Sequence, residues 1–204
     1  MKYDPNIHDR RSIRLKGYDY SKAGLYFVTI CTQNRLCLFG EIEHGEMILN
    51  DAGMMIKTIW HEIPIYYHGF NIHEFVVMPN HFHGIIQIAS NPKPVGAGPR
   101  ACPVINECQR TNGEPETNGQ PQQIGQPRGV APTMSLPDIV HRFKTLTTKR
   151  YIDGVNNNNW HPFNKKLWQR NYFEHIIRNH ESYLKITEYI HANPVKWRED
   201  KYYA

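Results

Sequence analysis

The alternation of apolar and polar positions predicts several short strands in the first half of the chain. Residues 24–32 form a compact run of aromatic and β-branched side chains, which is typical of a buried strand. A returning strand is predicted over residues 36–42, and two more over 72–78 and 83–88. The last two are separated by the pair Pro79-Asn80, which favours a sharp turn.

Three other segments show the spacing of amphipathic helices. Apolar residues within 52–63 recur on one helical face, and Pro64 predicts the end of that helix. Ser135 is a suitable cap for a second helix, whose apolar stripe extends over residues 136–146. A third helix is predicted over about 181–193, where the proline that follows stops it.

Residues 91–133 follow neither pattern. Pro, Gly, Gln, Asn and Thr dominate this segment and its apolar residues are scattered, so we expect a disordered, low-complexity insertion within one domain that spans residues 1–204. The remaining order is strands, helix, two strands, helix, a short strand and a last helix. This order predicts an α+β fold, with a ferredoxin-like antiparallel sheet and helices packed on one face, plus the long polar insertion.

The composition narrows the class of protein. The formal net charge of +5 at pH 7 favours an acidic partner, and nucleic acid is the commonest one for a basic domain. The first residues lack the apolar core of a secretory signal, and no stretch reaches the ~18 apolar residues of a membrane span. The four cysteines form no C-x-x-C pair, which indicates reduced thiols. We therefore expect a cytoplasmic protein with no membrane partner.

The segment MPNHFHG, residues 78–84, places His81 and His83 two positions apart at the start of a predicted strand. Side chains with this spacing point to the same face, and their backbones lie about 6.5 to 7 Å apart, so both imidazoles can reach one ion. Two neutral imidazoles and an oxygen ligand suit a divalent ion such as Mn²⁺, Zn²⁺ or Mg²⁺. Two protein nitrogens also leave coordination positions open, as a catalytic metal requires.

In the third helix, Lys185, Tyr189 and Asn193 follow one another at steps of four along the edge of the apolar face. An edge position allows the tyrosine hydroxyl to reach a cleft while its ring stays packed. The amide oxygen of Asn193 is a suitable ligand for a hard divalent ion. A free tyrosine hydroxyl has a pKa near ~10 and is a poor nucleophile at neutral pH, so the charge of Lys185 is predicted to favour its ionised form.

Taken together, these segments resemble the REP-associated tyrosine transposases, which belong to the HUH single-tyrosine transposases. The resemblance rests on MPNHFH at residues 78–83 and on YIHANPVK at residues 189–196. The stretch WQRNYFEHIIR at residues 168–178 and the early strand YFVT at residues 26–29 are also similar. Each motif is short, but their order and separation are specific, and the resemblance covers nearly the whole chain except the insertion.

The resemblance implies a role for each matching residue. His81 and His83 would hold a divalent metal, Mg²⁺ or Mn²⁺, and Tyr189 would be the nucleophile. Asn193 falls where related enzymes place a third metal ligand, although here the residue is Asn rather than Gln. The implied reaction is a transesterification that leaves a 5′-phosphotyrosine and a free 3′-hydroxyl. The implied partner is single-stranded DNA with hairpin or repeat structure, and relatives act as monomers or as homodimers that exchange tyrosine helices.

Two groups of basic residues are expected to contact DNA phosphates. An N-terminal arm contains Arg10, Arg11, Arg14 and Lys16. A second surface contains Lys165, Lys166, Arg170 and Arg178, interleaved with Trp160, Trp168 and Tyr172. Bases stack on aromatic rings while phosphates pair with cations, so this combination suits a single strand.

Two other functions fit the same residues. One is a sequence-specific single-stranded DNA-binding protein, derived from a transposase, that does not cut. The other is a metallohydrolase that uses the histidine pair and an activated water, and it would tolerate Tyr189→Phe. A small-molecule enzyme is disfavoured, because the sequence contains no glycine-rich phosphate loop or other recognisable cofactor motif.

Overall fold

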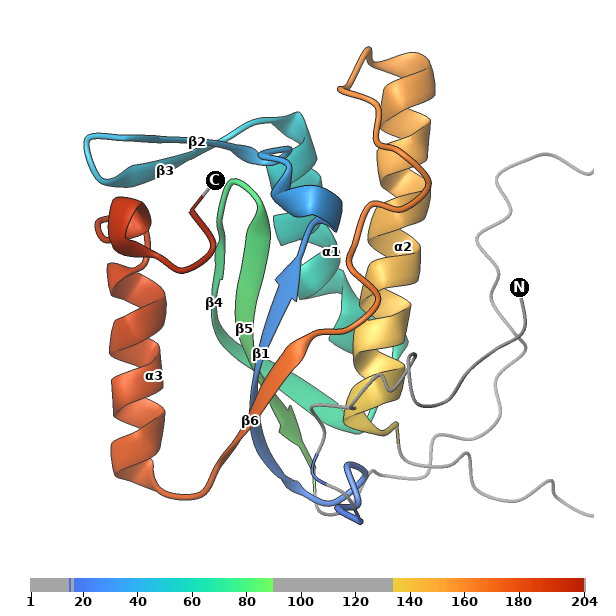
Figure 1. Ribbon diagram of the computed structural model, residues 1–204. Coiled ribbons are helices and arrows are strands. Elements are labelled where there is room, and N and C mark those ends of the chain that lie inside the picture. The colour runs from blue at the N-terminus through green and yellow to red at the C-terminus, as the bar shows by residue number, and fades with distance from the viewer. Residues whose placement is uncertain (1–14, 16, 90–133, 204) are drawn as a thin grey trace, which may run out of the picture. The chain divides into compact units, whose positions relative to one another are not determined.

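A computed structural model describes residues 15, 17–89 and 134–203 (Figure 1). The expected insertion at residues 91–133 lies outside the described residues, as do Arg10, Arg11, Arg14 and Lys16 of the expected N-terminal arm.

Four antiparallel strands form the central sheet. They are β1 (Gly24–Cys31), β4 (Phe70–Val77), β5 (His81–Ile88) and β6 (Phe173–Ile177), in the spatial order β4-β5-β1-β6. The register pairs Val28 with Gly84 between β1 and β5, and Phe27 with His175 between β1 and β6. Strand β1 lies inside the sheet because its side chains are apolar on both faces, as its unbroken hydrophobic run indicates.

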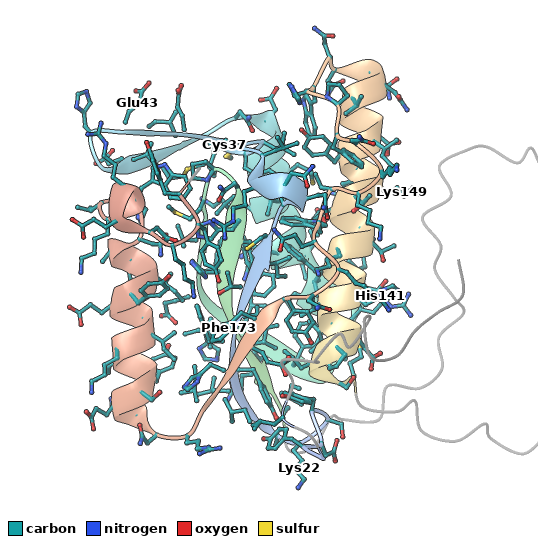
Figure 2. The ribbon with its side chains drawn as sticks, viewed as in Figure 1. Lys22, Cys37, Glu43, His141, Lys149 and Phe173 are labelled. Atoms are coloured by element: carbon teal, nitrogen blue, oxygen red, sulfur yellow. The ribbon has the colours of Figure 1, made fainter. Side chains whose placement is uncertain are left out.

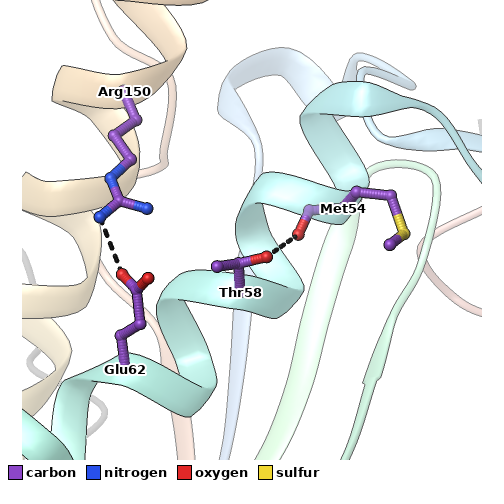
Figure 3. A network of polar contacts seen from close by, with 4 residues as sticks. All are labelled: Met54, Thr58, Glu62 and Arg150. Atoms are coloured by element: carbon purple, nitrogen blue, oxygen red, sulfur yellow. Dashed lines mark hydrogen bonds and ion pairs between the residues drawn. The ribbon is translucent and has the colours of Figure 1, made fainter.

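Helices α1 (Asp51–Tyr66) and α2 (Leu136–Asn157) cover one face of this sheet. Their buried residues pack with the alternate strand positions Tyr26, Val28 and Phe82 in the main core. On their outer side the two helices are joined by an ion pair between Glu62 and Arg150, whose charged atoms lie 2.8 Å apart (Figure 3). The α+β class and the ferredoxin-like antiparallel sheet are therefore confirmed.

Helix α3 (His180–Ala192) lies on the opposite face (Figure 1). There Ile190 packs in a cluster with Phe27 and Ile85. The expectation that the helices share one face is wrong for this helix. The physical reason is that the strands present apolar side chains on both faces, and the second face must also be covered. In the described residues, α1 and α2 thus cover one face of the sheet and α3 covers the other.

Smaller elements surround the sheet. A 3₁₀ turn, η1 (Gln33–Arg35), leads to a separate hairpin of β2 (Gly40–Glu43) and β3 (Glu46–Leu49), and a second 3₁₀ turn, η2 (Trp197–Glu199), follows α3. The predicted strand over 36–42 is therefore too long and begins too early. A Cβ at Gly40 would collide with the carbonyl oxygen of Ile48, so close pairing in this hairpin requires glycine.

Helix α1 also differs from its expected end. It continues past Pro64 to Tyr66, and the backbone N–H of Tyr67 still bonds to the carbonyl of Ile63. A proline this close to the end removes one hydrogen bond without stopping the last turn. Within the described ranges, no helix combines the length and apolar character needed to cross a bilayer. Cys31 and Cys37 are free thiols, as expected, while the other two cysteines lie outside the described residues.

Candidate active site

Strand β5 directs both histidines of the motif toward the face covered by α3. Because side chains alternate along a strand, His81 and His83 share this face with Ile85, while Phe82 points into the main core. Both imidazoles are almost fully buried, and their Nε2 atoms lie 3.0 Å apart. The two Nε2 atoms are therefore close enough to bind the same ion.

The side chain of Asn80 sets the tautomer of His81. Its amide nitrogen donates to the carbonyls of Arg35 and Tyr202, at 3.2 and 2.8 Å, so its Oδ1 is left to accept from His81 Nδ1 at 2.9 Å. His81 therefore carries its hydrogen on Nδ1. In the neutral ring, Nε2 then has a free lone pair, which is the form that binds a metal.

His83 is oriented by the neighbouring strand. Its Nδ1 lies 2.8 Å from the hydroxyl oxygen of Thr29 on β1, which can accept a hydrogen from that nitrogen. Burial lowers the pKa of His81 to about 4, with Asp200 acting in the opposite direction, and burial also lowers the pKa of His83 well below its usual range. Both rings are thus neutral at pH 7, and metal binding needs no loss of a proton from either.

Tyr189 extends from α3 to the histidine pair. Its hydroxyl lies 3.4 Å from Nε2 of His83, and its ring packs edge-on against Phe27, with centroids 6.1 Å apart. The residue is 41% exposed, so the hydroxyl is open to an incoming ligand while one side of the ring is packed. Burial, followed by the charge of Asp200, raises the pKa of Tyr189 to about 12.

Lys185 does not act on Tyr189 as the sequence predicts. Its ammonium pairs with Glu181 at 2.7 Å, and both side chains are largely exposed. The step of four residues places Lys185 beside Tyr189 and Glu181 alike, and the carboxylate one turn earlier attracts the charge. The pKa of Tyr189 is raised rather than lowered, because burial and a nearby carboxylate outweigh any distant lysine. Lys185 nevertheless lines the same cleft as Tyr189.

Asn193 follows α3 and is buried, with an exposed fraction of 2%. It lies close enough to His81 and to Tyr189 to influence the pKa of both side chains. Its Oδ1 accepts no hydrogen bond from any described residue. A buried carbonyl oxygen without a partner is costly, and a bound cation would satisfy it.

The donor set fits a divalent ion. It combines two neutral imidazole nitrogens with a hard amide oxygen, which is the mixture that Mg²⁺ and Mn²⁺ accept alongside water. The separation of the histidine nitrogens is also suitable, because two ligands at about 2.1 Å from one ion and at right angles lie about 3 Å from each other. The observed 3.0 Å agrees with this arrangement.

Two further residues of this region, Asp200 and Lys201, belong to no recognisable sequence motif. A carboxylate oxygen of Asp200 and the nitrogens of His81 and His83 all lie within 4.8 Å of one another. The ammonium of Lys201 lies over the rings of Phe173 and Tyr202, at 5.1 and 4.8 Å from their centroids. Both residues follow η2 in a run of mixed charges, where no spacing or periodicity distinguishes them from a solvated surface.

Tyr189 opens into a cleft of about 670 Å³. This volume is within the range of pockets that hold a small organic ligand, so it can admit a nucleotide as well as an ion. Phe27 and Phe173 form apolar walls, and Lys185, Lys196 and Lys201 line the cleft among the described residues. Glu188, Glu199 and Asp200 line the cleft as well, so its described lining combines three ammonium groups with three carboxylates.

The expected second basic surface lies elsewhere. Lys165, Lys166, Arg170 and Arg178 are all exposed, but none is among the described residues that line the tyrosine cleft. The segment before β6 packs along α2, because Tyr151 donates to the carbonyl of His161 and Trp168 donates to Thr147. Lys149 projects outward from the same helix and adds to the exposed charge there (Figure 2).

The aromatic residues of that surface are not available for base stacking, which corrects the sequence-based hypothesis. Trp168 and Tyr172 are buried in the main core, with 4% and 8% of their surface exposed. Trp160 is partly buried and packs against Tyr151. These rings are near basic residues in the sequence, but large aromatic side chains are more stable in the core than in water. Their neighbours in the sequence therefore did not show whether they are exposed. Phe173, by contrast, is 43% exposed and borders the tyrosine cleft (Figure 2).

The chain is similar to a known protein family in sequence and to a solved structure in fold. Residues 129–193 match the model of the family described as transposase IS200 like. A protein of Haemophilus influenzae strain Rd, described as uncharacterized, is 41% identical over 206 residues, covering 100% of this chain and 98% of its own length. The solved structure of a REP-associated tyrosine transposase bound to a REP hairpin superimposes with a TM-score of 0.52 at 19% identity. That match covers 93% of this chain and 77% of the other, and it shows a shared fold.

Proposed function

The chain belongs to the IS200-like transposase family, and we propose that it cleaves and rejoins single-stranded DNA with Tyr189 as the nucleophile. The observation that carries this proposal is the position of the Tyr189 hydroxyl, 3.4 Å from Nε2 of His83, in a residue that lines a cleft together with three lysines and three acidic residues. A candidate nucleophile thus lies next to candidate metal ligands and opens to a cleft with lysines in its lining.

The proposed reaction is a transesterification at a DNA phosphodiester. The Tyr189 oxygen bonds to phosphorus and loses its proton, while the 3′ oxygen departs and gains one, leaving a 5′-phosphotyrosine and a free 3′-hydroxyl. Because the phosphoester bond is exchanged rather than hydrolysed, the reverse reaction can rejoin a strand without ATP. The pKa of about 12 means that Tyr189 is protonated at neutral pH, so the proton must leave during the attack.

His81, His83 and Asn193 are the residues that we propose to hold the divalent ion, Mg²⁺ or Mn²⁺. When bound, such an ion supplies Lewis-acid stabilisation of the charge that develops on the phosphate and on the departing oxygen. Asn80 and Thr29 hold the two imidazoles in place through hydrogen bonds of 2.9 and 2.8 Å. These contacts fix the rings before substrate arrives, so little reorganisation is needed.

The lysines of the cleft are proposed to position the phosphate. Lys196 and Lys201 line the same cleft as Tyr189 and would offer ammonium groups to the backbone of the strand. Lys185 is bound to Glu181 and would have to exchange this exposed ion pair for a phosphate, which costs little in water. Phe173 presents an exposed ring at the same cleft, on which a base could stack.

The proposed DNA partner is a single strand with hairpin or repeat structure. This partner is suggested by the solved relative, which is bound to a REP hairpin. The exposed residues Lys165, Lys166, Arg170 and Arg178 are proposed to contact phosphates outside the cleft, together with the arm of Arg10, Arg11, Arg14 and Lys16. One chain contains every group named for the reaction, so a monomer would suffice and a homodimer is not required. We also propose that residues 1–204 form a single domain that works in the cytoplasm.

The test is a covalent-capture assay. Purified protein is mixed with Mg²⁺ or Mn²⁺ and labelled single-stranded hairpin DNA from repeats that flank its gene, and the products are separated on a denaturing gel. A protein–DNA adduct is expected with the natural chain, and with neither Tyr189→Phe nor the double variant His81→Ala/His83→Ala.

Two outcomes would contradict the proposal. DNA retention in a native gel with no adduct and no cleavage, for every metal and repeat tested, would indicate a binding protein that does not cut. Cleavage that survives in Tyr189→Phe would indicate an activated water and a metallohydrolase. The Tyr189→Phe variant is a well-matched control, because the ring contact with Phe27 remains after only the hydroxyl is removed.

A further inference from the structure

The segment that follows α3 returns to the histidine pair and brings Asp200 with it. This residue comes directly after η2, and its carboxylate lies with the histidine nitrogens in a group whose atoms are all within 4.8 Å of one another. We propose that Asp200 is a ligand of the metal ion, so that the C-terminal segment, in addition to β5 and the end of α3, builds the metal site. This inference rests on the proposed function only in assuming a divalent ion.

Charge supports an acidic ligand at this position. His81 and His83 are neutral, and the amide of Asn193 is neutral as well, so these three ligands alone would leave a buried dication uncompensated. Burying an uncompensated charge is expensive, and carboxylate oxygens are preferred ligands of Mg²⁺ and Mn²⁺. In the part of the chain that the structure describes, His81, His83 and Asp200 form the one detected group of three or more side chains of these types that could hold a metal ion.

The carboxylate is held in position by its own segment. One oxygen of Asp200, Oδ1, accepts the backbone N–H of Tyr202 at 2.6 Å. This hydrogen bond fixes the orientation of the carboxylate beside the histidine nitrogens and close to the Tyr189 hydroxyl. A ligating carboxylate that is also hydrogen-bonded is the usual arrangement around a protein-bound metal.

Asn80 connects the two sides of the proposed site. Its Oδ1 accepts from His81, and its amide donates at 2.8 Å to the carbonyl of Tyr202, two residues beyond Asp200. The ring of Tyr202 also packs on His81, with centroids 4.8 Å apart. The same buried side chain thus orients a histidine ligand and anchors the turn that presents Asp200.

Metal binding by Asp200 would also affect the C-terminal segment. If Asp200 binds the ion, metal binding ties residues 194–203 to β5 and stabilises their position over the sheet. Amide hydrogens of this segment should then exchange more slowly with the metal present than in its absence. The proposal therefore has a readout that does not depend on DNA cleavage.

The experiment is a Mn²⁺ titration of the full chain after removal of metal with EDTA, followed by calorimetry and by electron paramagnetic resonance. Asp200→Ala is expected to lower Mn²⁺ affinity by about tenfold or more, and Asp200→Asn, which keeps the shape and one neutral oxygen, by less. Glu199→Gln is the matched control, because Glu199 is the adjacent acidic residue but lies outside the donor group. It should bind Mn²⁺ as the natural chain does.

Hydrogen exchange supplies the second measurement. Mn²⁺ should slow exchange within residues 194–203 in the natural chain and in Glu199→Gln, but not in Asp200→Ala. Thermal melting in EDTA identifies a variant that fails to fold, and in that case the isosteric Asp200→Asn decides the result.

The outcomes separate this inference from the proposed function. If Asp200→Ala binds Mn²⁺ as tightly as the natural chain while His81→Ala does not, Asp200 is not a ligand and the histidine site remains. If Asp200→Ala keeps its Mn²⁺ affinity but forms no DNA adduct, the Asp200 carboxylate acts on the neighbouring Tyr189 hydroxyl. The ligand role of Asp200 is then overturned. If the natural chain binds no Mn²⁺, both the inference and the proposed metal site are wrong.

Discussion

The hydroxyl of Tyr189 lies 3.4 Å from Nε2 of His83, although the two residues belong to α3 and β5 and are far apart in the sequence. The ring of Phe27 joins them, because it stacks on His83 with centroids 5.3 Å apart and meets Tyr189 edge-on. Phe27 is 6% exposed, so this contact is part of the core that holds α3 on the sheet. The relative position of tyrosine and histidine is therefore set by packing rather than by local sequence.

Thr29 is predicted to support metal binding through His83. Replacing it with Val keeps the shape of the side chain but removes the oxygen that lies 2.8 Å from His83 Nδ1. A histidine ligand that loses its outer hydrogen bond binds metal about 10-fold more weakly or worse. Mn²⁺ calorimetry should show this decrease for Thr29→Val, whereas Thr29→Ser, which keeps the hydroxyl, should bind nearly as the natural chain does. Equal affinity in the valine variant would show that the hydroxyl does not position the ring.

Asn80 is predicted to be important for stability. Asn80→Ala would leave the buried Nδ1–H of His81 and the carbonyls in the partly buried contacts with Arg35 and Tyr202 without their present partner. Unsatisfied buried groups cost about 1–3 kcal/mol each before relaxation, so we expect a loss of about 3 kcal/mol in the free energy of unfolding. Urea denaturation measures this loss, and the exposed Asn71→Ala on β4 is the control. A loss no larger than that of the control would contradict the prediction.

Gly84 is predicted to be required by core packing next to the histidines. A Cβ at this position would lie 2.8 Å from ring atoms of both Phe82 and Trp60. Overpacking of this kind costs about 1–3 kcal/mol, so Gly84→Ala should reduce stability by that amount in urea. The same substitution should cost less when Trp60 is replaced by Phe, because the smaller ring no longer reaches the new methyl group. Additive effects in this double-mutant cycle would show that another contact is responsible.

The contact between Tyr183 and Glu74 is predicted to make stability depend on pH. The Tyr183 hydroxyl donates to the Glu74 carboxylate at 2.6 Å and joins α3 to β4. This hydrogen bond lowers the pKa of Glu74 below its usual 4.5, with smaller contributions from His73 and His191. The same bond raises the pKa of Tyr183 above its usual 10.0.

These two pKa shifts stabilise the fold in opposite directions of pH. A lowered carboxyl pKa stabilises the fold above about pH 4.5, and this stabilisation disappears as the pH falls through the folded pKa. A raised tyrosine pKa stabilises the fold below about pH 10, and that contribution is lost at higher pH. Thermal melts should therefore show Tyr183→Phe less stable than the natural chain near pH 7, with the difference shrinking toward pH 3. A difference that is the same at both values would mean that the hydroxyl acts independently of the carboxylate charge.

The residues alone are sufficient to predict the features that depend on local periodicity. The central strands, the three helices and the cap at Ser135 follow from residue spacing and side-chain type, since these set the pattern of burial and of end hydrogen bonds. The two histidines share a strand face for the same reason, because alternation along a strand is a local property. The step of four from Tyr189 to Asn193 is equally local, and it predicted that both residues point the same way.

Which of these local features come into contact depends on how the whole chain packs. Helix α3 covers the face opposite α1 and α2, so its tyrosine reaches the histidines. Asp200 and Lys201 join the site through a turn that has no sequence pattern of its own. Lys185 pairs with Glu181, and Trp168 packs in the core, because each side chain has a nearer partner than the one its position in the sequence indicates. Contacts between distant segments depend on how apolar faces are buried together, and that is a property of the whole chain.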